Sequence, residues 1–248
     1  EVRNGMMIPS LTPASINTSL PNGTAVYTGD YNLLGEKHGE GEMVWSNGDT
    51  YTGAFFKDCR QGHGVLTFSS RDPSQTDGGE YVGDWKANQM HGSGTRRYPN
   101  SDVYMGEYVN GKRDGEGRFY YANGDLYWGD WKENQMHGNG RYYYLSGQRF
   151  EGTFTSSKRN GKGKLQRVDG TLEIFQYVND HRVGQGVRWS EDRTKAWRLW
   201  APKTSTGQAN FGSQMEKQSI SIAEAVSLDY EIEQAALCYA KDAGFSLS

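Results

Sequence analysis

The chain has 248 residues and a formal net charge of −3, so it is long enough for a sizeable core and has no overall charge that would attract nucleic acid. Aromatic residues make up 13% of the chain and glycine supplies 33 residues. Because disordered chains are poor in aromatic residues, this composition excludes a disordered polymer and favours a folded β protein with a core of rings.

The first 26 residues differ from everything that follows them. Residues 1–26 contain no aromatic side chain and are rich in Ser, Thr, Asn and Pro. A segment of this kind cannot build a core of its own. It predicts a flexible N-terminal tail, or an arm that lies along another surface.

From Tyr27 onward the sequence is periodic. The marker is a pair of glycines one residue apart, and successive pairs are separated by 23 residues with a single gap of 30. The pairs are Gly39/Gly41, Gly62/Gly64, Gly92/Gly94, Gly115/Gly117, Gly138/Gly140, Gly161/Gly163 and Gly184/Gly186. The near-identical stretches 83–98 and 129–144 start 46 residues apart, which is two periods. The sequence therefore predicts an array of seven units over residues 27–200.

Each unit opens with the pattern aromatic-x-Gly-x-aromatic, as in residues 81–85 (YVGDW). Residues i, i+2 and i+4 of a strand share one face, so each glycine lies between two rings and leaves room for a ring over the backbone. Turn signals such as Asn47-Gly48 separate the units. Each unit is therefore predicted to be a β-hairpin, and the fold an all-β, elongated, single-layer antiparallel meander of about fourteen strands.

The combined pattern resembles the MORN (membrane occupation and recognition nexus) repeat. The resemblance covers residues 27 to about 189, and six of the seven units match it well. It implies a scaffold, because MORN arrays without a catalytic domain occur in cytoskeletal, ciliary and membrane-contact assemblies. The first unit has one residue more than later units between its Tyr-x-Gly and its G-x-G. That spacing is similar to the MORN subunit of ciliary radial spoke heads.

Two units depart from the pattern. Seven extra residues fall within residues 70–79, and their composition predicts a longer turn that protrudes from one edge, with a recognition loop as the alternative. In the seventh unit Glu173 and Phe175 stand where Tyr and Gly belong. Terminal units of repeat arrays are commonly atypical because they cap the array, so we expect a cap here.

After the array, residues 201–218 are predicted to be a linker and residues 219–244 an amphipathic helix. Ser221 and Glu224 have the spacing of a capping box. The apolar residues of the helix recur at 3-4-3-4 spacing: Ala225, Leu228, Ile232, Ala235 and Tyr239.

Two interpretations of this helix remain open. In the first, it packs back on the C-terminal end of the ribbon and covers an exposed edge. In the second, it docks into a partner or dimerises through Leu228, Ile232 and Tyr239. Acidic residues on its other faces argue against an anionic membrane as that partner.

No residue pattern indicates catalysis, a metal ion or a cofactor. His38, His91 and His137 each precede the first glycine of a pair, so they recur with the repeat and serve it. The glycines are periodic, whereas a phosphate-binding loop needs one glycine cluster at a strand-to-helix turn. Cys59 and Cys238 cannot form a CxxC metal site, and so few cysteines favour a reducing, cytoplasmic compartment.

Two surfaces are predicted to bind other molecules. The first is an aromatic face suited to a helix or an extended peptide of a partner protein: Tyr31, Phe55, Trp85, Tyr108, Trp131 and Phe154. The second is a basic patch in the sixth unit, suited to an acidic protein surface or an anionic phospholipid: Lys158, Arg159, Lys162, Lys164 and Arg167. The alternative for the patch is that its residues only keep the sheet soluble.

Three functions are compatible with these features. The first is a non-enzymatic scaffold, a rigid spacer that binds partner proteins in a cytoskeletal or axonemal assembly such as a radial spoke. The second is a peripheral membrane adaptor that binds anionic phospholipids through the sixth unit. The third is an enzyme whose catalytic domain the repeats serve, as in plant phosphatidylinositol-phosphate kinases and one lysine methyltransferase. It is disfavoured because only about 48 residues follow the array.

Overall fold

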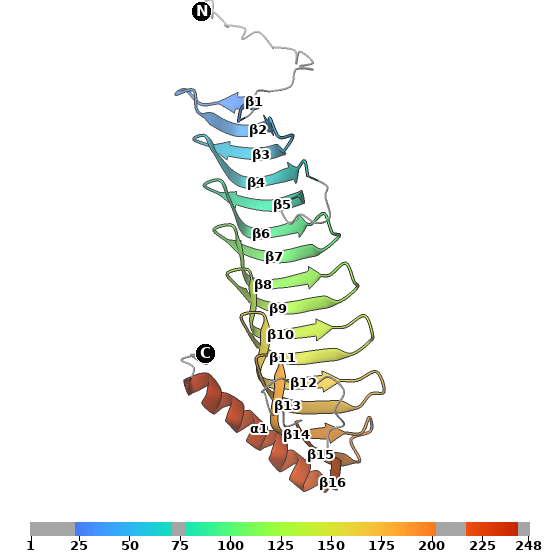
Figure 1. Cartoon of the computed structure of the whole chain (residues 1–248). Coiled ribbons are helices and arrows are strands. Elements are labelled where there is room, and N and C mark those ends of the chain that lie inside the picture. Colours follow the sequence, from blue (N-terminus) through green and yellow to red (C-terminus); the bar gives the residue numbers. More distant parts are fainter. Residues whose placement is uncertain (1–22, 71–77, 202–216, 243–248) are drawn as a thin grey trace, which may run out of the picture.

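The computed structural model describes residues 23–70, 78–201 and 217–242, with side chains as far as residue 236 (Figure 1). Within these residues the chain forms one long ribbon, a single sheet of 16 antiparallel strands that follow one another in sequence order. One helix packs against the C-terminal part of the ribbon. The all-β meander and the C-terminal helix predicted from the sequence are confirmed.

The elements alternate regularly along the chain. Most strands are seven to ten residues long. They are β1 (Ala25–Tyr31), β2 (Lys37–Trp45), β3 (Thr50–Phe56), β4 (Cys59–Phe68), β5 (Gly79–Lys86), β6 (Gln89–Arg97), β7 (Val103–Val109), β8 (Lys112–Tyr120), β9 (Leu126–Lys132), β10 (Gln135–Tyr143), β11 (Arg149–Thr155), β12 (Lys158–Gln166), β13 (Leu172–Val178), β14 (His181–Trp189), β15 (Ala196–Trp200) and β16 (Lys217–Ile220), followed by the helix α1 (Ile222–Asp242).

The seven repeat units are the seven hairpins from β1–β2 to β13–β14. Strands β15 and β16 extend the sheet beyond them, so the described residues hold two strands more than expected. The linker assignment is wrong for residues 217–218 and the helix assignment for residues 219–220, because all four belong to β16 and pair with β15. The tail assignment is wrong for residues 25–26, because they begin β1. The rest of the assigned linker, residues 71–77 of the insertion and residues 1–22 of the tail lie outside the described residues.

The two glycines of each pair have different roles. The first, such as Gly62 (φ 79°), has a positive φ in all seven units, a conformation that favours glycine. It lies where a register shift interrupts the pairing inside its hairpin, whereas the pairing between successive hairpins has no such shift. The second, such as Gly64, lies against the Tyr51 ring, which a Cβ would overlap. The hairpins therefore bend at the glycine pair while the joins between them stay regular.

The tyrosine that opens a unit lies along its own strand. The Tyr51 hydroxyl donates a hydrogen bond to the backbone carbonyl of Ala54 at 3.1 Å, and four other units repeat this bond. Each such ring meets the second aromatic ring of its own unit and of the next unit edge to face, with centroids 5.0–5.5 Å apart. An unbroken column of rings therefore runs from Tyr31 to Tyr177. Each contact adds ~0.5–1.5 kcal/mol beyond area burial.

We call the side of the sheet that carries this column the ring face, and the other side the helix face, because α1 packs there. Ala225, Leu228 and Ile232 are buried in one cluster with Ile174 and Val187. By strand alternation those last two point away from the ring column. The helix runs obliquely across the last hairpins (Figure 1). It packs back on the ribbon, as one interpretation proposed, but it covers the face of the sheet rather than its edge.

Two residues of the seventh unit create the surface on which α1 packs. Ile174 and Val187 occupy positions that hold Glu151 and Lys164 in the sixth unit. Replacing charges by aliphatic side chains creates an apolar floor, and fully burying one such side chain stabilises by ~1.5–3 kcal/mol. The N-terminus of the helix is closed by the predicted capping box, since the Ser221 hydroxyl and the Glu224 carboxylate each accept the other residue's backbone N–H.

Candidate functional site

The predicted aromatic face is mostly inside the protein. Phe55, Trp85, Tyr108, Trp131 and Phe154 are only 3–5% exposed, whereas Tyr31, at the end of the column, is 58% exposed. The expectation that these rings form an open surface is therefore wrong for five of the six. The physical reason is the bend at each glycine pair, which folds the hairpin around its own rings. Burial of the column also raises the pKa of Tyr51 to about 12.

A second line of rings on the ring face stays partly open. These half-buried aromatic residues end the second strand of a hairpin or follow it directly, and they pack on the outside of the ring column. We call them the outer strip: Trp45, Phe68, Tyr98, Tyr121 and Tyr144. These residues are not among those predicted to bind partners, although Tyr121 and Tyr144 alternate with the glycine pairs at the same period of two.

Arginines line the ring face beside the outer strip. The Arg60 guanidinium lies 4.2 Å from the Trp85 ring centroid, and the Arg113 guanidinium lies 4.4 Å from that of Trp131. Each also donates to a backbone carbonyl in the next turn. From the second to the sixth unit arginine alternates with methionine (Met90 and Met136) at this position, whereas the seventh unit again has an arginine, Arg182. The duplicated stretches 83–98 and 129–144 thus each contain a tryptophan that lies under the arginine of the preceding unit.

The outer strip begins at a pocket that we call the entry pocket. It is lined by Gly23 and Thr24, where the described chain begins, and by Trp45, Arg60 and Phe68. The Gly23 N–H donates to the Ser46 hydroxyl at 3.0 Å. The pocket therefore opens where the N-terminal tail meets the ring face.

A buried arginine lies between the second and third rings of the outer strip. Arg96 is 4% exposed, and its guanidinium lies 4.4 Å from the Phe68 ring centroid and 4.9 Å from that of Tyr98. It donates to the carbonyls of Gly78 and Glu80, where the chain re-enters the sheet after the insertion. A buried charge with several carbonyl acceptors is satisfied. Arg96 therefore fixes the base of the insertion against the strip.

The predicted basic patch is not a single surface. Arg159 lies on the ring face, 5.0 Å from the Tyr177 ring centroid, and pairs with Asp180. Lys162 lies on the helix face, where it bridges Asp229 and Glu233 of α1 at 2.6 and 3.1 Å. Lys158 and Lys164 are exposed, and Arg167 pairs with Glu173. The expectation of one continuous patch is wrong because alternation along β12 sends its side chains to opposite faces.

Lys162 holds its charge in this bridge. Burial alone would lower the pKa of its amine, but the hydrogen bonds and charges of Asp229 and Glu233 outweigh that effect and raise the pKa. The amine therefore stays protonated and joins the sixth unit to the helix. This contact leaves Lys162 poorly placed to bind an external anion.

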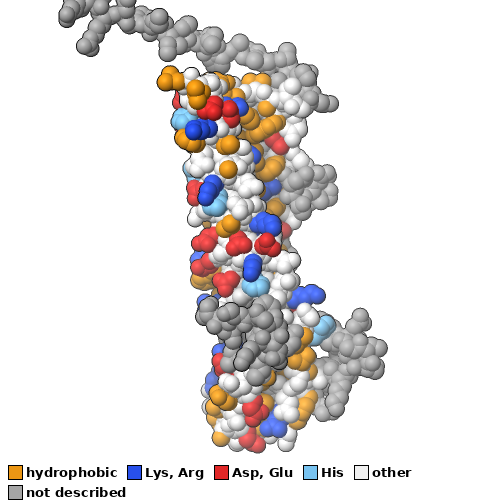
Figure 2. Space-filling model, turned by 90° about the vertical axis from the view of Figure 1, so that its left-hand side faces the viewer, with side chains coloured by type: hydrophobic (Ala, Val, Ile, Leu, Met, Phe, Trp, Pro, Cys, Tyr) orange, Lys and Arg blue, Asp and Glu red, His pale blue; other side chains and the backbone are white. Residues whose placement is uncertain are grey.

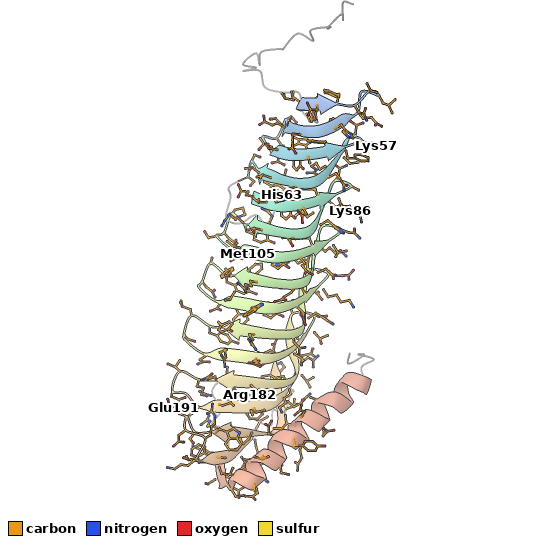
Figure 3. The ribbon with its side chains drawn as sticks, turned by 180° about the vertical axis from the view of Figure 1, so that it is seen from behind. Lys57, His63, Lys86, Met105, Arg182 and Glu191 are labelled. Carbon is orange, nitrogen blue, oxygen red and sulfur yellow. The ribbon has the colours of Figure 1, made fainter. Side chains whose placement is uncertain are left out.

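The tyrosine position of the seventh unit holds a caged carboxylate. Glu173 is 0% exposed and accepts hydrogen bonds or ion pairs from Arg167 at 3.0 Å, from Arg182 at 2.9 Å and from Arg188. Burial alone would raise the pKa of Glu173, but the Arg182 charge and the bonds from the other two arginines lower it. The carboxylate therefore remains ionised. Figure 3 labels Arg182 near this end of the ribbon.

Phe175 stands at the glycine position of the same unit. Its ring fills the space that the opening aromatic ring occupies in the other units. It is 0% exposed, and a Cβ at Gly186 would overlap its ring. The ring column therefore ends in a charged plug and a displaced ring. The two departures at Glu173 and Phe175 therefore lie where the column of rings ends, and the sheet continues past them with β15 and β16.

Of the predicted helix-docking residues, Leu228 and Ile232 are buried against the sheet at 4% and 5% exposure. Tyr239 belongs to α1, but its side chain lies outside the described part of the structure. The outward side of the helix carries Val226 and Tyr230, which are 58% and 63% exposed. Within its own chain the helix thus uses the first three residues of the predicted stripe, Ala225, Leu228 and Ile232, whereas Ala235 is exposed.

Neither a metal centre nor a membrane-spanning helix emerges from the described residues. Across residues 23–70, 78–201 and 217–242, no three His, Cys, Asp or Glu side chains come together in a way that could hold a metal ion. Over the same ranges no helix is both long and apolar enough to cross a membrane.

The sequence matches one protein family over most of the array. The family described as MORN repeat matches seven segments: residues 27–50, 51–72, 81–103, 104–126, 127–149, 150–172 and 176–195. Each segment overlaps one of the seven hairpins, the last one beginning within β13, and together the segments make up more than half of the chain.

Curated relatives share only part of the array. Alsin of Rattus norvegicus is 38% identical over 80 residues, and Alsin of Homo sapiens is 37% identical over 80 residues. Each alignment covers 32% of this chain and 5% of the relative. The chain therefore matches a small part of these much longer proteins.

The solved structures that match this chain are distant from it. The G-box domain of the microcephaly protein CPAP has a TM-score of 0.43 and 12% identity, covering 80% of this chain and 100% of that chain. The TCP10 domain of Danio rerio CPAP, solved with a peptide of STIL, has a TM-score of 0.36 and 12% identity, covering 76% of this chain and 98% of that chain.

Proposed function

We propose that this chain, which belongs to the MORN-repeat family, is a non-enzymatic scaffold whose ring face holds a helix or an extended peptide of a partner protein. The observation that carries the proposal is the outer strip, a line of half-buried Trp, Phe and Tyr side chains on a rigid ribbon. Side chains of this kind anchor protein interfaces because they bury a large area at low entropic cost.

The rigidity of the surface supports the same role. The outer strip packs directly on the ring column, whose edge-to-face contacts continue through every hairpin from β1 to β13. A preformed surface loses little conformational freedom on binding. Arg60 and Arg113 add guanidinium groups beside the rings. The ring face therefore combines apolar contact area with hydrogen-bond donors, as peptide grooves do.

We assign the scaffold to a cytoskeletal or axonemal assembly. The support is the spacing of the first unit, residues 27–41, which is similar to that of the radial-spoke MORN subunit. Microscopy of the tagged full chain in ciliated cells checks this assignment. Axonemal fluorescence supports it, and a diffuse signal that shows no enrichment on any filament contradicts it.

The binding surface is tested with a displayed peptide library. Peptides selected on the full chain are titrated against the wild type, Tyr121→Ser and Trp128→Ser. Trp128 is a matched control because it is also a partly buried ring, but it lies on the helix face under Arg118. We expect Tyr121→Ser to weaken binding at least ~10-fold and Trp128→Ser to change it less than ~2-fold. Equal binding to the wild type and Tyr121→Ser contradicts the proposal.

A peripheral membrane adaptor is the second candidate. Lys158 and Lys164 are exposed on the sixth unit, and each basic residue near an anionic membrane contributes ~1 kcal/mol. Co-sedimentation with phosphoinositide vesicles at physiological salt tests this function. Binding that disappears in Lys158→Glu with Lys164→Glu supports it. An absence of binding by the wild type removes it.

A further inference from the structure

We propose that residues 1–22 fold back onto the ring face of their own chain, enter the entry pocket and cover the start of the outer strip. The tail then acts as a built-in competitor for the partner peptide. This inference rests on the proposed function, because it takes the outer strip to be a peptide-binding surface.

The described chain begins in the wall of the entry pocket. Gly23 and Thr24, which follow the tail directly, are themselves walls of the entry pocket. Two hydrogen bonds fix them there: the Gly23 N–H donates to the Ser46 hydroxyl at 3.0 Å, and the Ser46 N–H donates to the Thr24 carbonyl at 2.9 Å. The described chain is therefore joined to the tail at the pocket itself. No search through solution is needed to bring the two together.

The side chains of the entry pocket match those of the tail chemically. The pocket walls are the rings of Trp45 and Phe68, together with Leu66 and Arg60. One guanidinium nitrogen of Arg60 already donates to the Asn88 carbonyl, so the pocket does not require an acidic ligand. The tail matches this environment, since Glu1 and Arg3 are its only charged side chains.

The tail also has the composition of a groove ligand. It holds aliphatic and thioether side chains between prolines: Met6, Met7, Ile8, Pro9, Leu11, Pro13, Ile16, Leu20 and Pro21. Proline-containing segments favour extended conformations and dock on aromatic grooves with a small entropic cost. The absence of aromatic residues from the tail, which leaves it without a core of its own, suits a segment that borrows the rings of the outer strip.

The length of the tail can be compared with the length of the outer strip. An extended segment of 22 residues spans up to about 70 Å at ~3.1 Å per residue. The outer strip from β2 to β10 crosses eight strand spacings, or about 40 Å at ~4.8 Å each. The tail is therefore long enough to cover every ring of the strip. A short covalent link also gives it an effective concentration of order millimolar, so even weak contacts fill the pocket.

The test measures hydrogen exchange of the tail amides in the full chain, with a synthetic peptide of residues 1–22 as the reference. We expect the tail to exchange at least ~10-fold more slowly in the chain than in the free peptide. Tail amides that exchange as fast as those of the peptide overturn the inference.

Substitutions in the tail keep this test independent of ribbon folding. Ile8→Asp with Leu11→Asp places charges among the apolar residues and should abolish the protection. Asn4→Asp with Ser10→Asp adds the same charge at polar positions and should leave at least half of it. Protection that survives the first pair contradicts docking by the apolar residues. On the ribbon, Phe68→Leu should weaken the protection, whereas Trp128→Ser should not.

Two further measurements separate the remaining outcomes. Protection that falls on dilution, together with a dimeric mass in solution, means that the tail occupies a second copy and overturns the intramolecular form. The selected peptides described above should bind at least ~5-fold more tightly to the Ile8→Asp, Leu11→Asp variant, because the competitor is removed. An unprotected tail with Tyr121-dependent peptide binding sinks this inference alone. A protected tail without any peptide binding sinks the proposed function instead.

Discussion

The two ends of the ribbon are built from the same repeat but finish differently. At the N-terminal end β1 is the outer strand, and the ring column stops at Tyr31, which is 58% exposed. Leu33 and Leu34 stand on the adjoining turn, and hydrophobic side chains gather at this end in the space-filling view (Figure 2). At the C-terminal end Glu173 and α1 close the column and the helix face.

This difference shows how few changes turn a repeat into a cap. Glu173 replaces a tyrosine, Phe175 replaces a glycine, and Ile174 and Val187 replace charged residues of the sixth unit. Beyond the seventh hairpin the described sheet continues with β15 and β16 and not with another repeat unit, so this hairpin meets different neighbours from the others. The first hairpin shows no comparable substitution. The described N-terminal end is therefore open, and it is the end where the tail meets the ring face.

The largest expected effect comes from opening the closed end. Glu173→Ala leaves three guanidinium groups without their shared carboxylate, and breaking such a buried charge network should cost ~3–5 kcal/mol of the free energy of unfolding. Urea unfolding with hydrogen exchange on β13 and β14 measures it. The matched control is Glu151→Ala, whose partner Arg141 is half exposed, with an expected cost below ~1 kcal/mol. Equal losses in the two variants would falsify the closed-end interpretation.

The next effect compares the middle of the column with its open end. A Cβ at Gly117 would overlap the fully buried Tyr104 ring, and a Cβ at Gly41 would overlap the Tyr27 ring. Tyr27 is only partly buried and can swing towards solvent. We expect Gly117→Ala to cost ~3 kcal/mol and Gly41→Ala ~1 kcal/mol in urea unfolding. A larger loss at Gly41 argues against an open N-terminal end.

A smaller effect separates the two sides of α1. Leu228 is 4% exposed and Val226 is 58% exposed. Leu228→Ala should cost ~2 kcal/mol and release the helix, because it leaves a cavity on the apolar floor. Val226→Ala should change the free energy of unfolding by less than ~0.5 kcal/mol. The measurement is amide exchange on α1, and the prediction fails if both variants release the helix alike.

The smallest effect is a difference in titration along the column. Burial raises the pKa of Tyr51 to about 12, so the stability contributed by its neutral form is complete below the unfolded pKa of 10.0 and is lost as the pH rises towards 12. A tyrosine in an unfolded chain ionises near ~10. Phenolate absorbance of the folded protein should therefore keep rising above pH ~10, and that late rise should coincide with loss of β-sheet circular dichroism. A single step near pH 10 contradicts a closed column.

In the candidate site, the sequence pattern predicted which residues share a face but not which of them are buried. The aromatic-x-Gly-x-aromatic pattern correctly placed Tyr51 and Phe55 on one face, but it could not indicate that the hairpin bends around them. That bend depends on Gly62, whose positive φ accompanies a register shift between paired strands. Pairing between strands is a tertiary property. The partly exposed ring is therefore Phe68 and not Phe55, although both residues follow the same period of two.

The basic patch teaches the same lesson. Lys162 and Arg159 are close in sequence, and their shared sign suggested one surface. Alternation alone would have separated them, but the partner of Lys162 is an acidic pair on α1, about 70 residues later in the chain. No local pattern identifies a contact over that separation. The sequence alone therefore could not show that Lys162 binds α1 and not an external anion.

By itself, the sequence determined the repeat and its period, the hairpin as the unit, the aromatic-glycine core and the existence of the helix after the array, because each is encoded by regular spacings along the chain. Only the tertiary structure decided which rings are enclosed, that Glu173 is caged by three arginines, and which face of the sheet α1 covers. Those outcomes depend on how neighbouring hairpins bend and stack. Exposure is a property of the stack, and a one-dimensional pattern does not contain it.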